Sequence, residues 1–382
     1  MRRDPWLDNA KFTLVTLVVI GHSFAILGAS ALELQVYDFI YFWHIPAFVL
    51  VSGHLSKGFV WDRKHFSSLF TTLVLPFLIF EPVLLAWREH LGEDTEGPLW
   101  LEPHWAMWYI VALFAWRLAT PVLRLHWLMV PASVAVSLAS GFSDVLTLSL
   151  PRILGLLPFF VIGLHLRREH LSVLTRARVR PFAAAAMLWI FVVAGSTDQW
   201  GRTAFLYHDR SYGALGVPGP EAMEVRLQVL LIGLVGAAAA LSLIPSRKLP
   251  ITAMGSASMV VYLFHGFVVR YAEAAGWLDP WRGHSALSIP LAVGGSVLLA
   301  LFLSWAPVAS RLTWFVDPVG SLRRRRAAEA GAGATPSGGT PSGAALRGDL
   351  VLNADVDGIR PSRDLTSVGS TTRDLTSAAG PR

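Results

Sequence analysis

Long apolar stretches recur along this chain, and each is long enough to cross a bilayer core of about 30 Å. There are ten, at about 12–31, 37–55, 69–87, 105–122, 127–142, 149–166, 181–197, 225–244, 252–275 and 287–308. Backbone polar groups have no water partners in lipid, so stretches this long and apolar cross it as helices. The sequence therefore predicts an all-α fold, a polytopic membrane helix bundle of about ten transmembrane helices.

Charged residues are scarce, which agrees with a body embedded in lipid. They make up 15% of the 382 residues, against roughly 25% in an average soluble protein. Cysteine is absent, so the chain has no thiol nucleophile, zinc–thiolate site or disulfide. A soluble enzyme and a disulfide-stapled fold are both excluded.

The positions of the basic residues predict how the helices are oriented. With the N-terminus in the cytoplasm, most of the 32 Lys and Arg residues fall on the cytoplasmic side, as the positive-inside rule requires. Ten spans then place both termini inside, and we expect a multi-pass protein of the plasma membrane. The net charge is +6, but the basic residues behind it are expected beside anionic lipid headgroups. We therefore expect no nucleic-acid partner.

Composition divides the chain into a membrane domain, residues 1–316, and a basic juxtamembrane segment with a tail, residues 317–382. From residue 327 onward there is no Phe, Tyr or Trp, and Ala, Gly, Ser, Thr and Pro dominate. Such a segment cannot bury a core, which predicts a disordered cytoplasmic tail. The tail contains Arg-Asp-Leu-Thr-Ser twice, at 363–367 and 373–377. A docking motif and drift in a low-complexity segment are the two interpretations.

Ionisable side chains inside a membrane span are costly and usually functional. The first span carries Lys11 and His22, eleven residues apart. Eleven steps of about 100° come within about 20° of three full turns, so both side chains share one face, about 16 Å apart along the axis. Lys11 is therefore expected at the cytoplasmic headgroup level, with His22 well inside the membrane.

Three histidines from three spans fall into one depth band. Helical rise places His44 about 10 Å, His22 about 13 Å and His265 about 15 Å below the outer boundary. Ser258 shares the face of His265. A single membrane histidine commonly bonds a neighbouring helix, but three at one depth favour a site. No span holds a His pair four residues apart, so we expect no metal.

Glu81 of the third span falls at a similar level. It has two interpretations, a structural pair with an outer arginine such as Arg152 and a functional role beside the histidines.

Four segments resemble the acyltransferase-3 family of integral-membrane proteins, especially its fucose 4-O-acetylase-like branch. They are Leu7 to Lys11 with Val19 to His22, Phe42 to Gly53, Trp105 to Tyr109, and Ser258 with Tyr262 to His265. A basic residue followed by ten residues and then His is the most specific of these signatures, and Lys11 and His22 fit it. An Arg-x-Arg motif that some members carry on the third span has no clear equivalent, which leaves the subfamily open.

The resemblance implies a membrane-bound O-acyltransferase that moves an acyl group, typically acetyl from acetyl-CoA, to a hydroxyl of a carbohydrate or glycosylated acceptor. Such a hydroxyl needs a base as it attacks the thioester, and a neutral imidazole suits this step. We expect His22 as general base, with His44 orienting it or donating to the oxyanion. Lys11 is expected to pair with CoA phosphates. The residues expected on the acceptor side are His265, Glu81, Tyr262 and Trp108.

A secondary transporter or flippase for a glycan or small metabolite is the alternative function, since it also fits many spans with intramembrane ionisable groups. Against it, no repeat relates the first five spans to the last five, and the polar groups concentrate in the first third. A structural protein of the envelope would not need three buried histidines.

Overall fold

The computed structural model of the protein describes residues 4–27, 30–95 and 97–332, and this part of the chain is helical, without strands. The longer helices are α1 (Pro5–Phe24), α2 (Ala31–Leu55), α4 (Leu75–His90), α5 (Trp108–Leu123), α10 (Arg180–Ala194), α13 (Gly219–Leu243), α14 (Ser258–Ala274) and α15 (Ser285–Ser304). The predicted all-α class is confirmed.

Shorter helices join or extend these. They are α3 (Arg63–Leu69), α6 (Met129–Ser140), α7 (Leu150–Gly155), α8 (Leu157–His165), α9 (Arg168–Leu174), α11 (Thr197–Trp200), α12 (Ala204–Tyr207), α16 (Ala306–Val316) and α17 (Pro318–Ala332). A π-helical turn is η1 (Phe70–Val74), and the 3₁₀ turns are η2 (Trp105–Met107), η3 (Thr147–Ser149), η4 (Ala177–Val179), η5 (Pro250–Ala257) and η6 (Asp279–Trp281).

Seven helical segments of the described residues are long and apolar enough to cross a membrane, or eight if the bent pair Thr147–Gly155 and Leu157–His165 is one span. Each of the ten stretches predicted from sequence coincides with a helical segment. Two of these ten segments are not among the seven or eight. They are α1, whose polar residues lower its mean hydropathy, and α6, which has only 12 residues. The protein is a multi-pass membrane protein, while ten crossings and the cytoplasmic N-terminus stay predictions.

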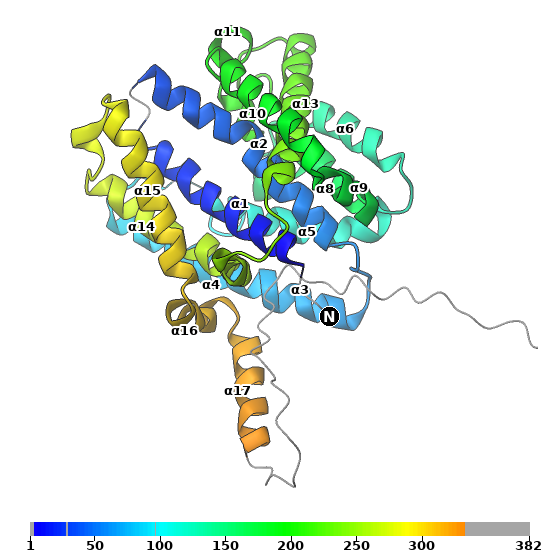
Figure 1. The fold of residues 1–382 in the computed structure, drawn as a ribbon, viewed down its shortest axis with the longest axis vertical. Helices are drawn as coiled ribbons and strands as arrows, with labels where there is room; N and C mark the ends of the chain where they lie inside the picture. The colour runs from blue at the N-terminus through cyan, green and yellow to red at the C-terminus, as the bar shows by residue number, and fades with distance from the viewer. Residues whose placement is uncertain (1–3, 28–29, 96, 333–382) are drawn as a thin grey trace, which may run out of the picture.

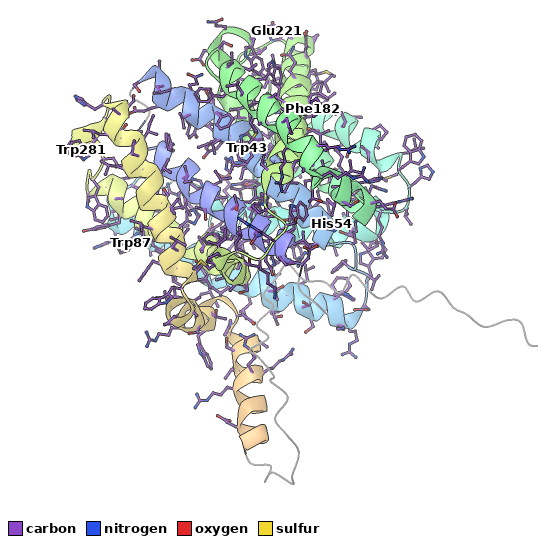
Figure 2. All side chains as sticks on the ribbon, in the orientation of Figure 1. Trp43, His54, Trp87, Phe182, Glu221 and Trp281 are labelled. Atoms are coloured by element: carbon purple, nitrogen blue, oxygen red, sulfur yellow. The ribbon has the colours of Figure 1, made fainter. Side chains whose placement is uncertain are left out.

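The outward faces of the bundle are apolar, as lipid contact requires. Phe182 on α10 is 76% exposed and Leu298 on α15 is 68% exposed, and Phe182 is labelled in Figure 2. A water-facing surface would hold charged side chains at such positions.

Helix α2 is the central element and packs against α8, α13, α1 and α10. Its contact with α8 depends on glycine in both helices. A Cβ on Gly53 would lie 2.1 Å from the carbonyl oxygen of Phe160, and one on Gly163 would lie 2.1 Å from that of Leu50. Small residues that let two backbones approach are typical of helix pairs in membranes.

Helix α1 packs against α2, α14, α15 and η5, and Figure 1 shows it beside α15. Asp4 caps its N-terminus by accepting from the backbone N–H of Trp6 at 3.0 Å. The Asn9 side-chain amide donates to the carbonyls of Pro245 and Arg247, at 2.8 and 3.0 Å. The first turns of α1 are therefore fixed to the segment that leads into η5.

Helix α17 covers the basic run 323–326 and extends away from the bundle (Figure 1). It includes residues 327–332, which composition had placed in the disordered tail. The rest of the predicted tail, with both Arg-Asp-Leu-Thr-Ser copies, lies outside the described residues. The domain boundary between 316 and 317 stays a prediction.

Candidate active site

His22 sits in the last turn of α1, within a cluster of three aromatic rings. Its ring centroid lies 4.3 Å from that of Trp105 and 5.3 Å from that of His265, and these two are 5.2 Å apart. The three rings come from α1, η2 and α14. The fold thus brings together two of the three histidines that helical rise had placed at one depth.

His44 faces the same turn of α1 from α2. Its Nδ1 lies 2.8 Å from the carbonyl oxygen of Ile40, and a carbonyl only accepts, so Nδ1 carries a proton. Its Nε2 lies 3.6 Å from the place a Cβ on Gly21 would take, and Tyr41 lies 3.2 Å from that place. Gly21 therefore leaves room for His44 and Tyr41 beside His22.

His265 is held in the same way. Its Nδ1 donates to the carbonyl of Tyr262 at 2.6 Å, while its buried Nε2 has no partner among the described residues. The His22 imidazole makes no hydrogen bond to any residue of the described part of the chain. Of the three histidines, His22 is the one with neither ring nitrogen hydrogen-bonded to a described residue, so both of its nitrogens are open to a ligand in the cavity.

His22 and His44 line a cavity of about 340 Å³, within the range of about 300–1,000 Å³ common for small-molecule sites. The other lining residues are Ala25, Tyr37, Tyr41, Ile45, Pro103, Trp105, Trp108, Arg152, Leu156, Leu206, Tyr207 and Asp209. The wall therefore combines imidazole, phenol, indole, guanidinium and carboxylate groups, a polar lining inside an apolar bundle.

The phenols form one edge of this cavity. The hydroxyls of Tyr37 and Tyr207 are hydrogen-bonded at 2.7 Å, and the ring of Tyr41 packs 4.9 Å from that of His44. Burial raises the pKa of Tyr207, which lies on a connection outside the spans. This phenol therefore stays neutral and acts as a hydrogen-bonding group, not as an anion.

Trp108, expected on the acceptor side, lines the cavity, and the Arg152 guanidinium lies 5.3 Å from its ring centroid. The cavity wall, among the described residues, does not include His265, Tyr262 or Glu81. The ring of His265 contacts the ring of His22 but does not line the cavity. The Tyr262 hydroxyl donates to the carbonyl of Ala106. These two support the site without lining it.

Glu81 pairs with a histidine instead of an arginine. Its Oε1 accepts from the His104 backbone N–H at 2.8 Å and from His104 Nδ1 at 2.6 Å, and both side chains are buried. The suggested partner, Arg152, pairs with Asp209 at 2.8 Å. That suggestion is wrong because depth along a helix does not fix the direction in which a side chain points.

Lys11 lies outside the cavity wall, among the described residues, and is buried near the other end of α1. Its Nζ pairs with Asp8 at 2.8 Å. The Asp8 carbonyl in turn packs under η5, where a Cβ on Gly255 would lie 2.3 Å from it. A role for Lys11 in donor binding stays a prediction.

Several lining residues were missed from the sequence. Tyr37 and Tyr41 precede His44 by seven and three residues, the spacing of one helix face, so periodicity was a usable signal. Tyr207 ends the one-turn helix α12 and Asp209 follows it, and a helix of four residues is too short to give a periodic signal. In the described residues no group of three His, Cys, Asp or Glu could hold a metal ion.

A family model described as an acyltransferase domain, acyltransferase 3, matches residues 4–306. The chain belongs to the acyltransferase-3 family. It is similar to nodulation protein NolL of Sinorhizobium fredii, at 22% identity over 84% of this chain and 91% of the relative. The NolL protein of Mesorhizobium japonicum is 25% identical over 78% of this chain and 85% of the relative. No solved structure matches.

Proposed function

We propose that this family member is a membrane-bound O-acyltransferase that moves an acetyl or other short acyl group from acyl-CoA to a hydroxyl of a carbohydrate or glycosylated acceptor. The observation that carries the proposal is the position of His22. Its imidazole lines a polar cavity of about 340 Å³ and has no hydrogen bond to a described residue. The family membership supports acyl transfer, and the plasma membrane is the proposed location.

His22 acts as the general base in this proposal. The imidazole accepts the proton of the acceptor hydroxyl as its oxygen attacks the thioester carbonyl. The carbon–sulfur bond then breaks, the ester remains on the acceptor, and the imidazolium returns the proton to the CoA thiolate. No cysteine is present to form a thioester intermediate, and direct transfer is a simpler route than a relay through an acyl-serine.

The hydrogen bond from His44 Nδ1 to the carbonyl of Ile40 limits the roles that His44 can take in the reaction. Because Nδ1 is occupied by Ile40, only Nε2 faces the reaction. A neutral His44 accepts a hydrogen bond through Nε2 and so orients a donor beside His22. It donates to the thioester oxyanion only when protonated. We favour the orienting role, which needs no buried charge.

The donor enters from the end of α1 that carries Lys11. Lys11 and His22 are eleven residues apart, which corresponds to about 16 Å of helix, a length that an extended pantetheine arm spans. A CoA phosphate would take over the Lys11 ammonium from Asp8, to which it is paired at 2.8 Å. The ammonium would then neutralise part of the donor's charge.

The test is a reaction of the purified protein in detergent with radiolabelled acetyl-CoA and a glycan fraction from the cells of origin. We expect CoA release that depends on the protein and labelled ester on the glycans. A transporter or flippase would produce neither. Labelled ester at the rate of a protein-free control would overturn the proposal.

A further inference from the structure

A second cavity adjoins the one that His22 lines. Its volume is about 490 Å³, and it shares Pro103, Arg152 and Asp209 with the His22 cavity. Its other lining residues are Glu102, Asp144, Leu146, Ser149, Pro151, Arg210, Ser211 and Ala214. We call it the outer cavity, because the predicted orientation places all three connections that form it on the extracytoplasmic side.

An ion pair stands where the two cavities meet. Arg152 and Asp209 are joined at 2.8 Å, and their side chains are 25% and 23% exposed. The second carboxylate oxygen of Asp209, Oδ1, is buried and has no partner in the described part of the chain. A buried carboxylate oxygen without a hydrogen-bond donor is costly. This oxygen is therefore placed to accept a hydrogen bond from a hydroxyl of a bound ligand.

The segment that carries Asp209 is held against the helix bundle by contacts with a buried arginine. The buried Arg226 of α13 donates to the carbonyl of Arg210 at 3.3 Å and to that of Ser137 at 3.2 Å. Its guanidinium also lies 4.8 Å from the ring centroid of Tyr212. A buried cation therefore fixes this wall of the outer cavity.

The charges of the outer cavity select against the acyl donor. Three carboxylates, those of Glu102, Asp144 and Asp209, face two guanidinium groups, those of Arg152 and Arg210. The lining therefore carries one more negative than positive group, which disfavours binding of the negatively charged phosphates of CoA. Carboxylate, guanidinium and hydroxyl groups together suit a neutral molecule with many hydroxyls, to which they offer both hydrogen-bond acceptors and donors.

We propose that the outer cavity binds the part of a neutral, polyhydroxyl acceptor that is not acylated, and that the Arg152–Asp209 pair binds the acceptor where it passes to His22. This inference rests on the proposed function and adds the acceptor's place and charge class. The acceptor hydroxyl that reacts lies in the His22 cavity, while neighbouring hydroxyls donate to Asp209 and accept from Arg152. Donor and acceptor then approach His22 from different sides.

The absence of cysteine makes the outer cavity testable by labelling. Ala214 and Leu146 are exposed and line this cavity, so A214C and L146C each introduce the single thiol of the chain. Cells that carry a variant in place of the natural protein are treated with a bulky, membrane-impermeant maleimide and then given ¹³C-acetate. Mass spectrometry of the cell glycans measures new ¹³C-acetyl ester. The matched control is A275C, at an exposed position that follows α14 outside the cavity.

We expect labelled A214C and L146C to lose at least about tenfold of the new ester, while labelled A275C keeps its level. Purified labelled A214C should still bind radiolabelled acetyl-CoA within about twofold of the unlabelled variant. Undiminished ester formation in fully labelled A214C and L146C would overturn the inference, as would a parallel loss of acetyl-CoA binding or failure of both thiols to react. Failure of the proposed function gives a different result, with no ester and no acetyl-CoA binding in the unlabelled protein.

Discussion

The imidazole of His22 lies against the indole of Trp105, with 4.3 Å between ring centroids and 45° between ring planes. Trp105 has a φ of 50°, a left-handed conformation that is costly for a bulky residue and persists only where the surroundings hold it. The preceding residue, His104, is bound twice by the buried carboxylate of Glu81. We therefore propose that Glu81 acts on the cavity indirectly, as a positioning residue for Trp105.

Replacement of Glu81 by alanine should lower both stability and turnover. The change leaves the buried His104 donors unpaired, and breaking a buried pair costs about 3–5 kcal/mol. Because the effect reaches His22 through Trp105, kcat should fall while the KM for acyl-CoA changes little. Thermal unfolding in detergent and steady-state kinetics measure the two effects.

The conservative variant E81Q separates positioning from folding. Its amide oxygen still accepts from His104, so it should recover most of the kcat that E81A loses. The exposed Glu221 of α13 provides a matched control, and E221A should change stability by no more than about 0.5 kcal/mol. A raised KM for acyl-CoA in E81A, at unchanged kcat, would contradict the positioning role.

Replacement of His22 by alanine should lower kcat by about 10²- to 10⁴-fold, the usual contribution of a general base. The protein should still fold and insert, because His22 makes no hydrogen bond to a described residue. Labelled acetyl-CoA consumption and thermal unfolding are the measurements. H126A is the matched control, because His126 is exposed on the connection between α5 and α6. An H22A protein with full activity would remove His22 from the mechanism.

The helices could be predicted from the sequence because apolar length is a local property. Breaks within them could be predicted only in part. The predicted stretch 149–166 is two helices bent by 54°, next to Pro158, and the stretch that begins near residue 69 enters α4 through the π-helical η1. Both breaks lie at a proline, Pro158 at the start of α8 and Pro76 at the start of α4, and proline removes a helical hydrogen bond. Proline therefore marks where a helix can break, but it does not give the angle or the kind of turn.

Part of the site could also be predicted, because helical rise sets depth. His22 and His265 do meet, and His44 lines the same cavity as His22. Helical rise does not give the direction in which a side chain points. For this reason Arg152 was wrongly predicted as the partner of Glu81, whose partner is His104. The pairing of Arg152 with Asp209 depends on how a long connection folds back over α7, and no local pattern in the sequence encodes it.

Replacement of Lys11 by methionine tests the donor site. Lys11 is buried and paired with Asp8 at 2.8 Å, so K11M should destabilise the fold by removing one partner of a buried pair. It should also raise the KM for acyl-CoA, because a cation that faces the donor phosphates is lost. The two effects must be separated, since a partly unfolded protein also loses activity.

The double variant D8N/K11M makes that separation. Removing the charge of Asp8 should restore part of the stability lost in K11M, as measured by thermal unfolding in detergent. The raised KM should remain, because the cation is still missing. Recovery of the wild-type KM together with stability would show that Lys11 serves only the fold.

His208 should make the stability of the protein sensitive to acid. It lies on the connection that precedes Asp209, and burial, together with the charges of Arg226 and Arg152, lowers its pKa from 6.5 to about 3. The unfolded chain binds a proton as the pH falls below about 6.5, whereas the folded chain does not until the pH nears 3. The stabilisation is therefore full above the unfolded pKa and is lost toward lower pH, by up to about 1.4 kcal/mol per pH unit.

The variant H208N removes this titration and keeps the backbone. His208 has a φ of 52°, and asparagine tolerates that conformation better than most residues. Between pH 6.5 and 4 the unfolding temperature of H208N in detergent should fall less steeply than that of the natural protein. The two proteins differ only at residue 208, so the difference between the two slopes reports His208. The exposed His126 gives the control, since H126N should leave the slope unchanged. Equal slopes for H208N and the natural protein would mean that folding does not lower the pKa of His208.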